Sequence, residues 1–245
     1  QIKLKPPTIL LDADYFFYRA ASASEYEMTY DADTTVIAGS LTNGQKIIRS
    51  DVRNLKEMFD TDQLIMTFTD VKNFRKTIDS SYKSNRTKRK PCGFKRLLNW
   101  AKTEYECIRM PQLEADDVLG ILSTSGCYSS FVIVSPDKDM EQIPCRIYNL
   151  KDEFTQTPEQ AEYKLYEQCL SGDPVDGYSG IKGIGKKKAQ LILNNKEGSY
   201  WDTVLSAFLE HGYKKADALR QLRLAKILHA DDWDFKKEEP ILYTP

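Results

Sequence analysis

Histidine is nearly absent from this chain, which has only His211 and His229 among 245 residues. This scarcity excludes a histidine-rich zinc site and gives little support to histidine catalysis. The five cysteines are odd in number and widely spaced, and they include no CxxC pair, which favours a reducing compartment over a disulfide scaffold. No apolar run reaches membrane-spanning length and no signal-peptide pattern occurs, so we expect a cytoplasmic protein without a membrane partner.

The charge balance is almost neutral, with 35 basic and 36 acidic residues, so net charge alone identifies no partner. The distribution of charge along the chain is more informative than its sum. The length allows one or two domains with a sizeable core. Because the chain begins at Gln1 rather than Met, we also expect that part of the native N-terminus is missing.

Apolar runs alternate with amphipathic or polar stretches through residues 8–150, and this alternation predicts an α/β fold. From Pro158 onward the pattern becomes helical, which predicts an α-helical region packed on the sheet domain. Residues 25–45 are polar and threonine-rich, and they fit a hairpin as well as a loop. The expected strands are 8–12, 64–70, 105–109, 131–135 and 145–149. The expected helices are 51–59, 113–123, 158–170, 185–195, 201–211 and 214–229.

Acidic residues stand where the apolar runs end. Asp12, Asp70 and Asp137 each follow such a run, and Asp139 comes two residues after Asp137. Because ligands bind at the carboxyl ends of the strands in open α/β sheets, we expect these side chains to share one pocket. Carboxylates in one pocket repel each other unless cations are bound, and all-oxygen ligands suit Mg²⁺ or Mn²⁺. The pattern therefore predicts a two-metal phosphoryl-transfer site. Two further acidic clusters are Glu114, Asp116 and Asp117, and Asp173 and Asp176.

Each of these acids has a plainer explanation when taken singly. An aspartate after a strand is often the N-cap of the next helix, and Asp116 and Asp117 could simply favour the dipole of a helix start. On a helix, Glu114 and Asp117 are i,i+3 neighbours, whereas Asp116 points about 100° away from Asp117. We therefore expect one of the two adjacent aspartates to lie outside direct contact with the metals.

Residues 72–96 form a strongly basic segment, with ten basic residues against one acidic residue. Phe74, Tyr82 and Phe94 are interleaved with the basic residues. Cationic side chains neutralise phosphates and aromatic rings stack on bases, so the segment predicts nucleic-acid contact. The plainer alternative is a solvated loop. The position of the segment, two residues after Asp70, favours the functional interpretation.

A glycine-rich turn occupies residues 177–189 and ends in three consecutive lysines. Its central part partly matches a nucleotide-binding P-loop, but Lys187 stands where Ser or Thr should hold the metal, and no buried strand precedes it. A helix–hairpin–helix fits better, because glycines permit a tight turn and free N–H groups at the next helix start can hold a phosphate. A simple helix connection is the alternative; the lysines favour binding to a duplex backbone.

Seven short motifs occur in order through nearly the whole chain. They are LDAD at 11–14, FTD at 68–70, YKSNR at 82–86, LEADD at 113–117, SPDKD at 135–139, GDPVDGYSGI at 172–181 and GIG at 183–185. Each motif alone is modest, but the ordered set resembles the 5′–3′ exonuclease/flap endonuclease superfamily. It is most similar to the 5′–3′ exonucleases of short-tailed (podovirus) bacteriophages.

The resemblance implies a mostly parallel sheet of the PIN/5′-nuclease type and metal-dependent hydrolysis of phosphodiester bonds near 5′ ends of duplex, flapped or gapped DNA. RNA–DNA hybrids are a further expected substrate, since some members remove RNA primers. A helical arch at 72–96 would bring the catalytic cations Lys83 and Arg86 to the scissile phosphate, with Tyr82 stacking near the 5′ end. The shortness of this arch argues against threading of a 5′ flap. The implied metal ligands are Asp12, Asp70, Glu114 and Asp116 for one Mg²⁺ (or Mn²⁺), and Asp137, Asp139, Asp173 and Asp176 for the second, with Asp117 near both.

The same resemblance divides the chain into a nuclease core, residues 1–157, and a helical DNA-binding region, residues 158–245. A helix–two-turn–helix element at 173–195 would bind K⁺ through its carbonyl groups beside a duplex phosphate. We expect a monomer that acts in replication, primer removal or DNA degradation, in the host cytoplasm if a phage encodes it. The expected DNA contacts are Lys72, Arg75, Tyr82, Lys88, Arg89, Lys90, Gly183, Gly185, Lys186, Lys187 and Lys188.

Two other classes of protein stay open as alternatives. In a haloacid-dehalogenase-like phosphatase, Asp12 and Asp14 would form the nucleophile motif and Asp173 and Asp176 the metal motif. That interpretation gives no role to Asp70 or to the other acidic residues, nor to the basic segment. A non-catalytic DNA-binding module would need the basic elements but not the full set of acids.

Overall fold

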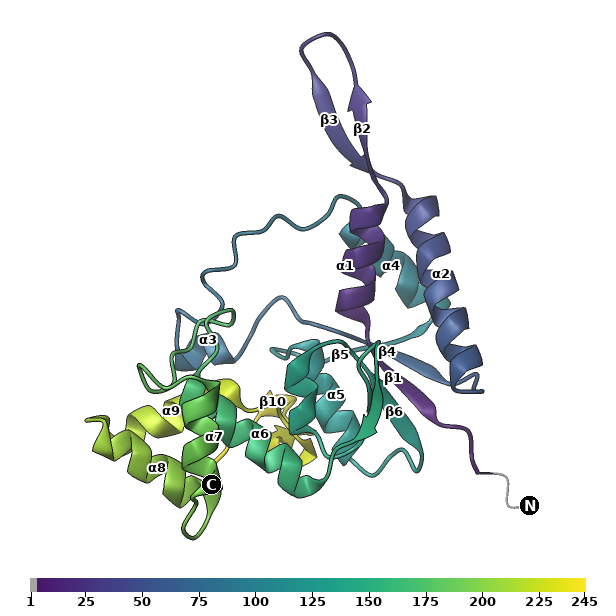
Figure 1. The fold of residues 1–245 in the computed structure, drawn as a ribbon. Helices are drawn as coiled ribbons and strands as arrows, with labels where there is room; N and C mark the ends of the chain where they lie inside the picture. Colours follow the sequence, from purple (N-terminus) through teal and green to yellow (C-terminus); the bar gives the residue numbers. More distant parts are fainter. Residues whose placement is uncertain (1–3) are drawn as a thin grey trace.

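A six-stranded sheet forms the centre of the protein in the computed structural model, which describes residues 4–245 (Figure 1). The strand order is β5-β4-β1-β6-β7-β8, and every neighbouring pair is parallel except β7 and β8. The strands are β1 (Thr8–Asp12), β4 (Leu64–Phe68), β5 (Glu106–Arg109), β6 (Phe131–Val134), β7 (Arg146–Tyr148) and β8 (Glu153–Thr155). The α/β class and the five expected strands are confirmed; β8 was not predicted.

The order of the strands places β1 at a switch in the direction of winding. The chain first adds β4 and β5 on one side of β1, and then β6 and β7 on the other. Asp12 is the last residue of β1, and Ser135 directly follows β6, which pairs with β1. Ligand sites in open α/β sheets lie at such a switch point, outside the carboxyl ends of the strands.

Helices cover both faces of the sheet, which explains why β1, β4 and β6 are almost entirely buried and mostly apolar. One face packs against α1 (Ala13–Ala23), α2 (Leu41–Met58) and α4 (Phe94–Glu104), and the other against α5 (Ala115–Thr124). Helices α1 and α4 were not predicted, because α1 begins without a turn after β1 and the first three residues of α4 belong to the basic segment. Helix α2 starts ten residues before the expected 51–59, since its first half is mostly polar.

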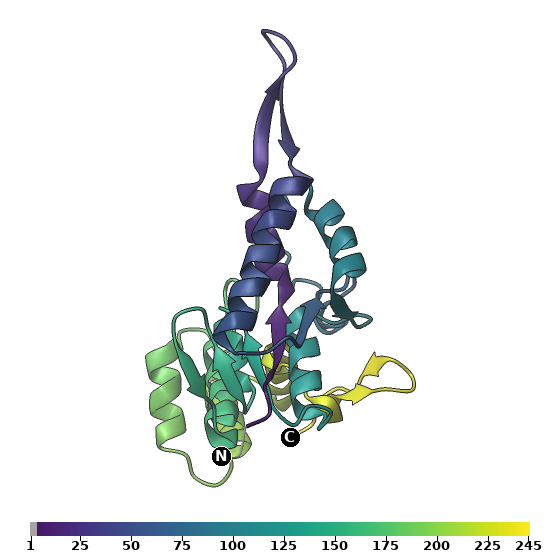
Figure 2. The same ribbon diagram turned by 90° about the vertical axis from the view of Figure 1, so that its right-hand side faces the viewer.

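Residues 25–39 form a hairpin of β2 (Glu25–Thr29) and β3 (Thr35–Gly39), followed closely by α2. The hairpin projects beyond α1 and α2, away from the sheet (Figures 1 and 2). Of the two alternatives for residues 25–45, the hairpin is observed for residues 25–39, whereas residues 41–45 belong to α2.

Four helices in the C-terminal part surround a second hydrophobic core, which includes Tyr166, Phe208 and Leu222. They are α6 (Pro158–Ser171), α7 (Lys186–Asn194), α8 (Tyr200–Glu210) and α9 (Lys215–Ala225). The expected helix 214–229 ends at Ala225, because the next residues bond to the sheet domain instead: Ile227 N–H donates to Gln142 and Leu228 N–H to Asp117. A short 3₁₀ helix (Ala230–Asp232) and the hairpin of β9 (Trp233–Asp234) and β10 (Glu239–Pro240) follow (Figure 2). Across residues 4–245, no helix combines the length and apolar character needed to cross a bilayer.

Residues 79–93, here called the strap, connect α3 (Arg75–Ile78) with α4 along the upper left of the molecule in Figure 1. The expectation of a helical arch is wrong for this segment, which has turns at 80–85 and then an irregular, extended course. Lys83 adopts a left-handed φ of 55°, which a helix does not allow. Repulsion among Arg86, Lys88, Arg89 and Lys90, with Pro91 after them, also disfavours a helix here.

Candidate active site

Carboxylates from separate parts of the chain meet at the carboxyl edge of the sheet. In residues 4–245, two groups have ligand oxygens within 4.8 Å of one another: Asp116 with Asp137 and Asp139, and Asp139 with Asp173 and Asp176. Asp139 belongs to both groups. These two sets, here called the acid groups, offer only oxygen donors and therefore fit divalent cations such as Mg²⁺ or Mn²⁺.

The acid groups are electrostatically unfavourable without cations. Burial, together with the neighbouring charge of Asp137, raises the pKa of both Asp12 and Asp139 from 3.8 to about 7. Burial and the charges of Asp137 and Asp12 likewise raise the pKa of Asp116. Such shifts are typical of carboxyl groups that share a site.

Several side chains that the sequence analysis did not select hold these carboxylates in place. The Ser135 hydroxyl donates to Asp12 Oδ2 at 2.7 Å, and the buried Gln168 amide donates to Asp139. Asp14 accepts a hydrogen bond of 2.9 Å from the Thr69 N–H and so ties the end of β4 to α1. No local pattern marks Gln168, because a polar residue in an amphipathic helix is usually read as facing solvent.

Two glycines allow the loop that carries Asp173 and Asp176 to fold closely on itself. Gly172 has a φ of 67°, and a Cβ there would lie 2.3 Å from the Ser179 carbonyl carbon. Gly180 has a φ of 57°, and a Cβ there would lie 2.4 Å from the Gly172 nitrogen. Only glycine fits both positions, so the sequence of this loop is tied to the placement of its two aspartates.

Asp117 does not join either acid group, and its expected place near both metals stays a prediction. Both of its carboxylate oxygens are 2.7 Å from Arg75 nitrogens, and Oδ1 also accepts from the Leu228 N–H at 3.1 Å. The helix geometry required one of the adjacent aspartates to point away, and Asp117 is that residue. Asp116 is the one that faces Asp137 and Asp139.

Asp12, Asp70 and Glu114 also lie outside the acid groups, so Asp116 is the one member of the first expected ligand set that belongs to them. The Glu114 carboxylate accepts from Arg75 at 2.9 Å and from the Tyr82 hydroxyl at 3.0 Å, and it pairs with Lys83. Burial opposes its ionisation, but Lys83 and Arg75 lower the pKa of Glu114 to about 2. Asp70 Oδ2 accepts from the Gln112 N–H at 2.8 Å, which fixes the connection between β5 and α5.

The strap brings two cations to the acid groups. Lys83 Nζ lies 3.7 Å from Asp176 Oδ1 and pairs with Glu114, while Arg86 bonds Asp176 at 2.8 Å. On the other side of the loop, Lys138 pairs with Asp173 at 3.2 Å. The remaining space beside Tyr82 is a cavity of about 10 Å³, room for roughly one water molecule. Tyr82, Glu114, Asp116, Asp139 and Asp176 are among the residues that line this cavity, while Asp116, Asp137 and Asp139 are only partly buried.

Two of the expected DNA contacts are buried and are corrected here. Arg75 and Tyr82 are each 3% exposed. Arg75 bonds to Glu114, Asp117 and two backbone carbonyls, so no donor is left for a phosphate. The Tyr82 ring packs in the core of the C-terminal helices and cannot stack on a base there. The sequence around Arg75 and Tyr82 does not indicate that these side chains have buried partners elsewhere in the chain. Lys72, Lys88, Arg89 and Lys90 are exposed, and their DNA contacts stay predictions.

The glycine turn before α7 is open to solvent. A side chain at Gly183 or Gly185 would meet open space, and Lys186, Lys187 and Lys188 are exposed. Helix α7 begins at Lys186 with no side-chain cap on its first N–H groups. This geometry is suited to an anion, and the expected phosphate contact stays a prediction.

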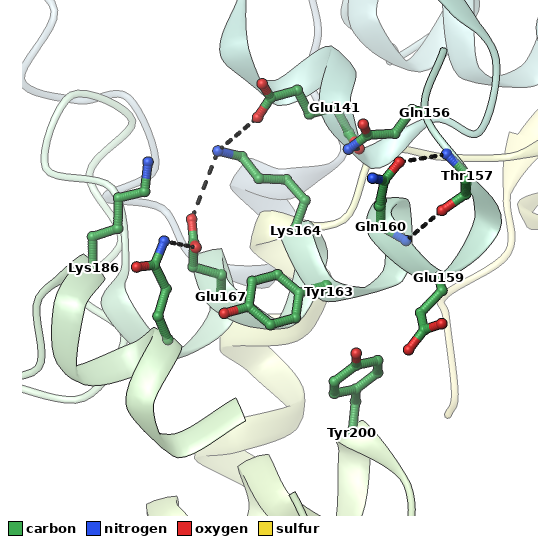
Figure 3. Close-up of a pocket in the computed structure, with 11 residues that line it drawn as sticks. Glu141, Gln156, Thr157, Glu159, Gln160, Tyr163, Lys164, Glu167, Lys186 and Tyr200 are labelled. Carbon is green, nitrogen blue, oxygen red and sulfur yellow. Dashed lines mark hydrogen bonds and ion pairs between the residues drawn. The ribbon is translucent and has the colours of Figure 1, made fainter. Parts of the chain in front are cut away.

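A larger groove of about 580 Å³ is lined by residues of α6, α7 and α8 and by Glu141, Gln156 and Thr157 (Figure 3). Three glutamates line it, and Lys164 is paired with two of them, Glu141 at 3.1 Å and Glu167 at 3.7 Å. None of the acid-group residues lines this groove. Lys186, at the start of α7, lines the same groove.

The fold has close counterparts among solved nuclease structures. Structures of phage T5 5′-exonuclease with zinc and of T5 flap endonuclease with DNA and metal ions give TM-scores of 0.62 and 0.63, each at 15% identity. The first match covers 89% of both chains, and the second covers 90% of this chain and 89% of the other. At this identity the likeness establishes the fold, so the protein has the fold of a 5′-nuclease.

The sequence relatives make the assignment more specific. The family model for the 5′–3′ exonuclease, N-terminal resolvase-like domain, matches residues 7–167, and the chain therefore belongs to the 5′–3′ exonuclease/flap endonuclease family. The exonuclease of Escherichia phage T7 is 28% identical, over 97% of this chain and 93% of the relative. The exodeoxyribonuclease of Enterobacteria phage T3 is 27% identical, over 97% and 92% respectively.

Proposed function

We propose that this protein hydrolyses phosphodiester bonds near the 5′ ends of duplex, flapped or gapped DNA with two divalent cations. The observation that carries the proposal is the pair of acid groups sharing Asp139, with Lys83 and Arg86 of the strap directly against them. The names of the relatives agree with it, since they include phage exonucleases and a T5 flap endonuclease crystallised with DNA and metal ions.

Asp116, Asp137 and Asp139 would hold one cation, and Asp139, Asp173 and Asp176 the other. When bound, Mg²⁺ or Mn²⁺ would lower the pKa of a water molecule and neutralise charge on the phosphate. Ser135 and Gln168 orient the carboxylates of Asp12 and Asp139.

Lys83 and Arg86 act on the substrate by changing partners. Both now bond carboxylates of this chain. As substrate enters, the strap moves outward and the two cations exchange Glu114 and Asp176 for non-bridging phosphate oxygens. Positive charge placed there stabilises the negative charge that builds up in the transition state.

The helical region of residues 158–245 would grip the duplex away from the cut. Its contact is the start of α7, where uncapped N–H groups and Lys186–Lys188 face solvent. A K⁺ ion held by carbonyls of the glycine turn is a further part of this proposal. So are RNA–DNA hybrids as substrates, a monomeric state and action in the cytoplasm.

Cleavage of 5′-labelled duplex DNA with Mg²⁺, set against turnover of p-nitrophenyl phosphate, tests this proposal. We expect labelled mononucleotides or short oligonucleotides from the duplex, and no p-nitrophenol. Turnover of p-nitrophenyl phosphate without DNA cleavage would favour the phosphatase, and duplex binding without cleavage the non-catalytic module. A panel of blunt, gapped and flapped substrates then separates exonuclease from flap endonuclease activity.

A further inference from the structure

Arg75 lies at the base of the strap, where neither DNA nor a metal ion can reach its side chain. It is only 3% exposed, and its guanidinium is flanked by the ring of Phe74 at 4.7 Å and that of Tyr82 at 5.9 Å. A buried cation in an apolar surrounding is costly unless every donor is bonded. A guanidinium has five N–H donors, and all five are used here.

The five hydrogen bonds join three separate parts of the fold. Nη1 donates to Glu114 at 2.9 Å and to Asp117 at 2.7 Å, and Nη2 donates to Asp117 at 2.7 Å. These two acids begin α5. Nε and Nη2 also donate to the carbonyls of Leu224 and Lys226, at 3.1 and 2.6 Å, at the end of α9. One planar group therefore fixes the base of the strap, the start of α5 and the end of α9 together.

The start of α5 determines the direction of Asp116, which stands between Glu114 and Asp117 and belongs to an acid group. Because Arg75 grips Asp117 with a rigid two-pronged contact, the first turn of α5 cannot rotate without breaking several bonds. We propose that Arg75 is a positioning residue for metal binding, which fixes Asp116 toward Asp137 and Asp139. This inference rests on the proposed metal-dependent function.

The contact of Arg75 with the end of α9 also helps to position the second acid group. The Gly180 N–H, in the loop that carries Asp173 and Asp176, donates to Gln221 of α9 at 2.8 Å. Helix α9 is in turn held at its end by Arg75. The two acid groups are thus aligned relative to each other through one buried guanidinium.

The test is Mn²⁺ binding to the Arg75→Lys variant, measured by calorimetry and electron paramagnetic resonance without DNA. Lysine keeps the charge but loses the two-pronged contact. We expect Mn²⁺ affinity to fall about 10- to 100-fold, the range typical for partners behind a metal ligand. Circular dichroism should show a folded protein, and duplex affinity in EDTA should change less than about twofold, because Arg75 contacts no DNA. In cleavage assays kcat should fall while KM stays near wild type.

Asp232→Asn is the matched control, because it weakens another buried ion pair at the end of α9, between Lys226 and Asp232 at 2.7 Å. We expect it to lower the melting temperature without changing Mn²⁺ affinity. A folded Arg75→Lys protein with wild-type Mn²⁺ affinity would overturn the positioning role.

If Arg75→Lys does not fold, Asp117→Asn serves instead, since it retains one oxygen for the guanidinium. The same loss of Mn²⁺ affinity is expected, and unchanged affinity overturns the inference. Failure of the wild type itself to bind Mn²⁺ would count against the proposed function, whereas wild-type binding with unaltered variants counts only against the role of Arg75.

Discussion

Two cationic parts of this protein use the same residue types in opposite ways. The strap turns Lys83 inward against Glu114 and Asp176, and Arg86 bonds Asp176 with a side chain that is still 54% exposed, whereas the lysine cluster at the start of α7, Lys186–Lys188, faces solvent without a carboxylate partner among residues 4–245. Burial opposes the charge of Lys83, but Glu114 and Asp176 outweigh it and raise the pKa of this amine. Charges in such a partly buried site are screened little by salt, while exposed lysines are screened strongly. On the proposed function, this difference assigns Lys83 of the strap to the chemical step and the lysine cluster to binding.

The largest loss of cleavage activity is expected when an acid group itself is altered. Asp139→Asn alters the one carboxylate that both groups share, so cleavage with Mg²⁺ should fall about 10³-fold or more, the result of several kcal/mol lost at the transition state. Duplex binding, measured by fluorescence anisotropy, should persist. Asp62→Asn, an exposed acid before β4 at the far end of the sheet, is the control. Near-wild-type turnover of Asp139→Asn in Mg²⁺ would remove the acid groups from the mechanism.

The second-largest effect is expected for Lys83 of the strap. Lys83→Ala should lower the single-turnover rate about 10²-fold, because the amine acts on charge that develops only in the transition state. Duplex affinity should change little, since one cation among many is removed. Lys76→Ala, an exposed lysine on α3, is the matched control and should change neither quantity greatly. A drop in affinity with an unchanged rate at saturation would place Lys83 with the binding residues.

A smaller effect on binding alone is expected from the lysine cluster. Replacing Lys186, Lys187 and Lys188 with Ala should weaken duplex binding about tenfold, and each phosphate that is no longer neutralised should reduce the salt slope by roughly one unit. Single-stranded DNA should be less affected, because it need not reach α7. The check is a salt titration of both substrates, with Lys236→Ala/Lys237→Ala as a control on the remote C-terminal hairpin. An unchanged duplex slope would make the glycine turn a plain connection between helices.

The smallest effect concerns stability and pH. Folded-state pKa values of about 7 for Asp12 and Asp139, against an ordinary 3.8, mean that the folded protein keeps protons that the unfolded chain loses between about pH 4 and 7. These groups therefore make the metal-free protein less stable as pH rises through that window. Bound Mg²⁺ favours the ionised carboxylates and removes this loss.

The melting temperature should accordingly gain more from Mg²⁺ at pH 8 than at pH 5.5. The difference should be a few degrees, since about 1 kcal/mol corresponds to about 2–4 °C at this size. Burial lowers the pKa of His229 to about 4, so this residue makes the protein more stable as pH rises toward 6.5. Its contribution is the same with and without metal and therefore cancels from the gain in melting temperature that Mg²⁺ produces. A gain that is equal at both pH values, measured by scanning calorimetry, would contradict the assignment.

The sequence was sufficient to locate the edge of the sheet where the acids meet. Apolar runs that end in Asp12 and Asp137 are local signals, and parallel strands bring such ends together. Helix geometry also predicted that Asp116 and Asp117 diverge, but which one faces the site depends on Arg75. That arginine lies 42 residues from Asp117 in the chain, and no local pattern links them.

The strap was the least predictable part of the site. Its basic composition indicated phosphate contact, yet it could not reveal that Tyr82 and Arg75 turn inward or that the segment is not helical. Those features depend on partners in α5 and α9, which are brought near only by the complete fold. The roles of Gln168 and Ser135 could not be predicted for the same reason. Each depends on a hydrogen bond to a carboxylate that is distant in the chain.

The most direct test of the contrast between the strap and the lysine cluster is a single experiment on two variants. Single-turnover rates and duplex dissociation constants are measured together on one 5′-labelled duplex, with Mg²⁺ for the rates and EDTA for the dissociation constants. The account predicts that Lys83→Ala loses rate at saturating enzyme but keeps affinity, whereas the triple Lys186–Lys188 variant loses affinity but keeps rate. If both variants lose rate and affinity in the same proportion, the two cationic parts are not functionally distinct and the account is contradicted.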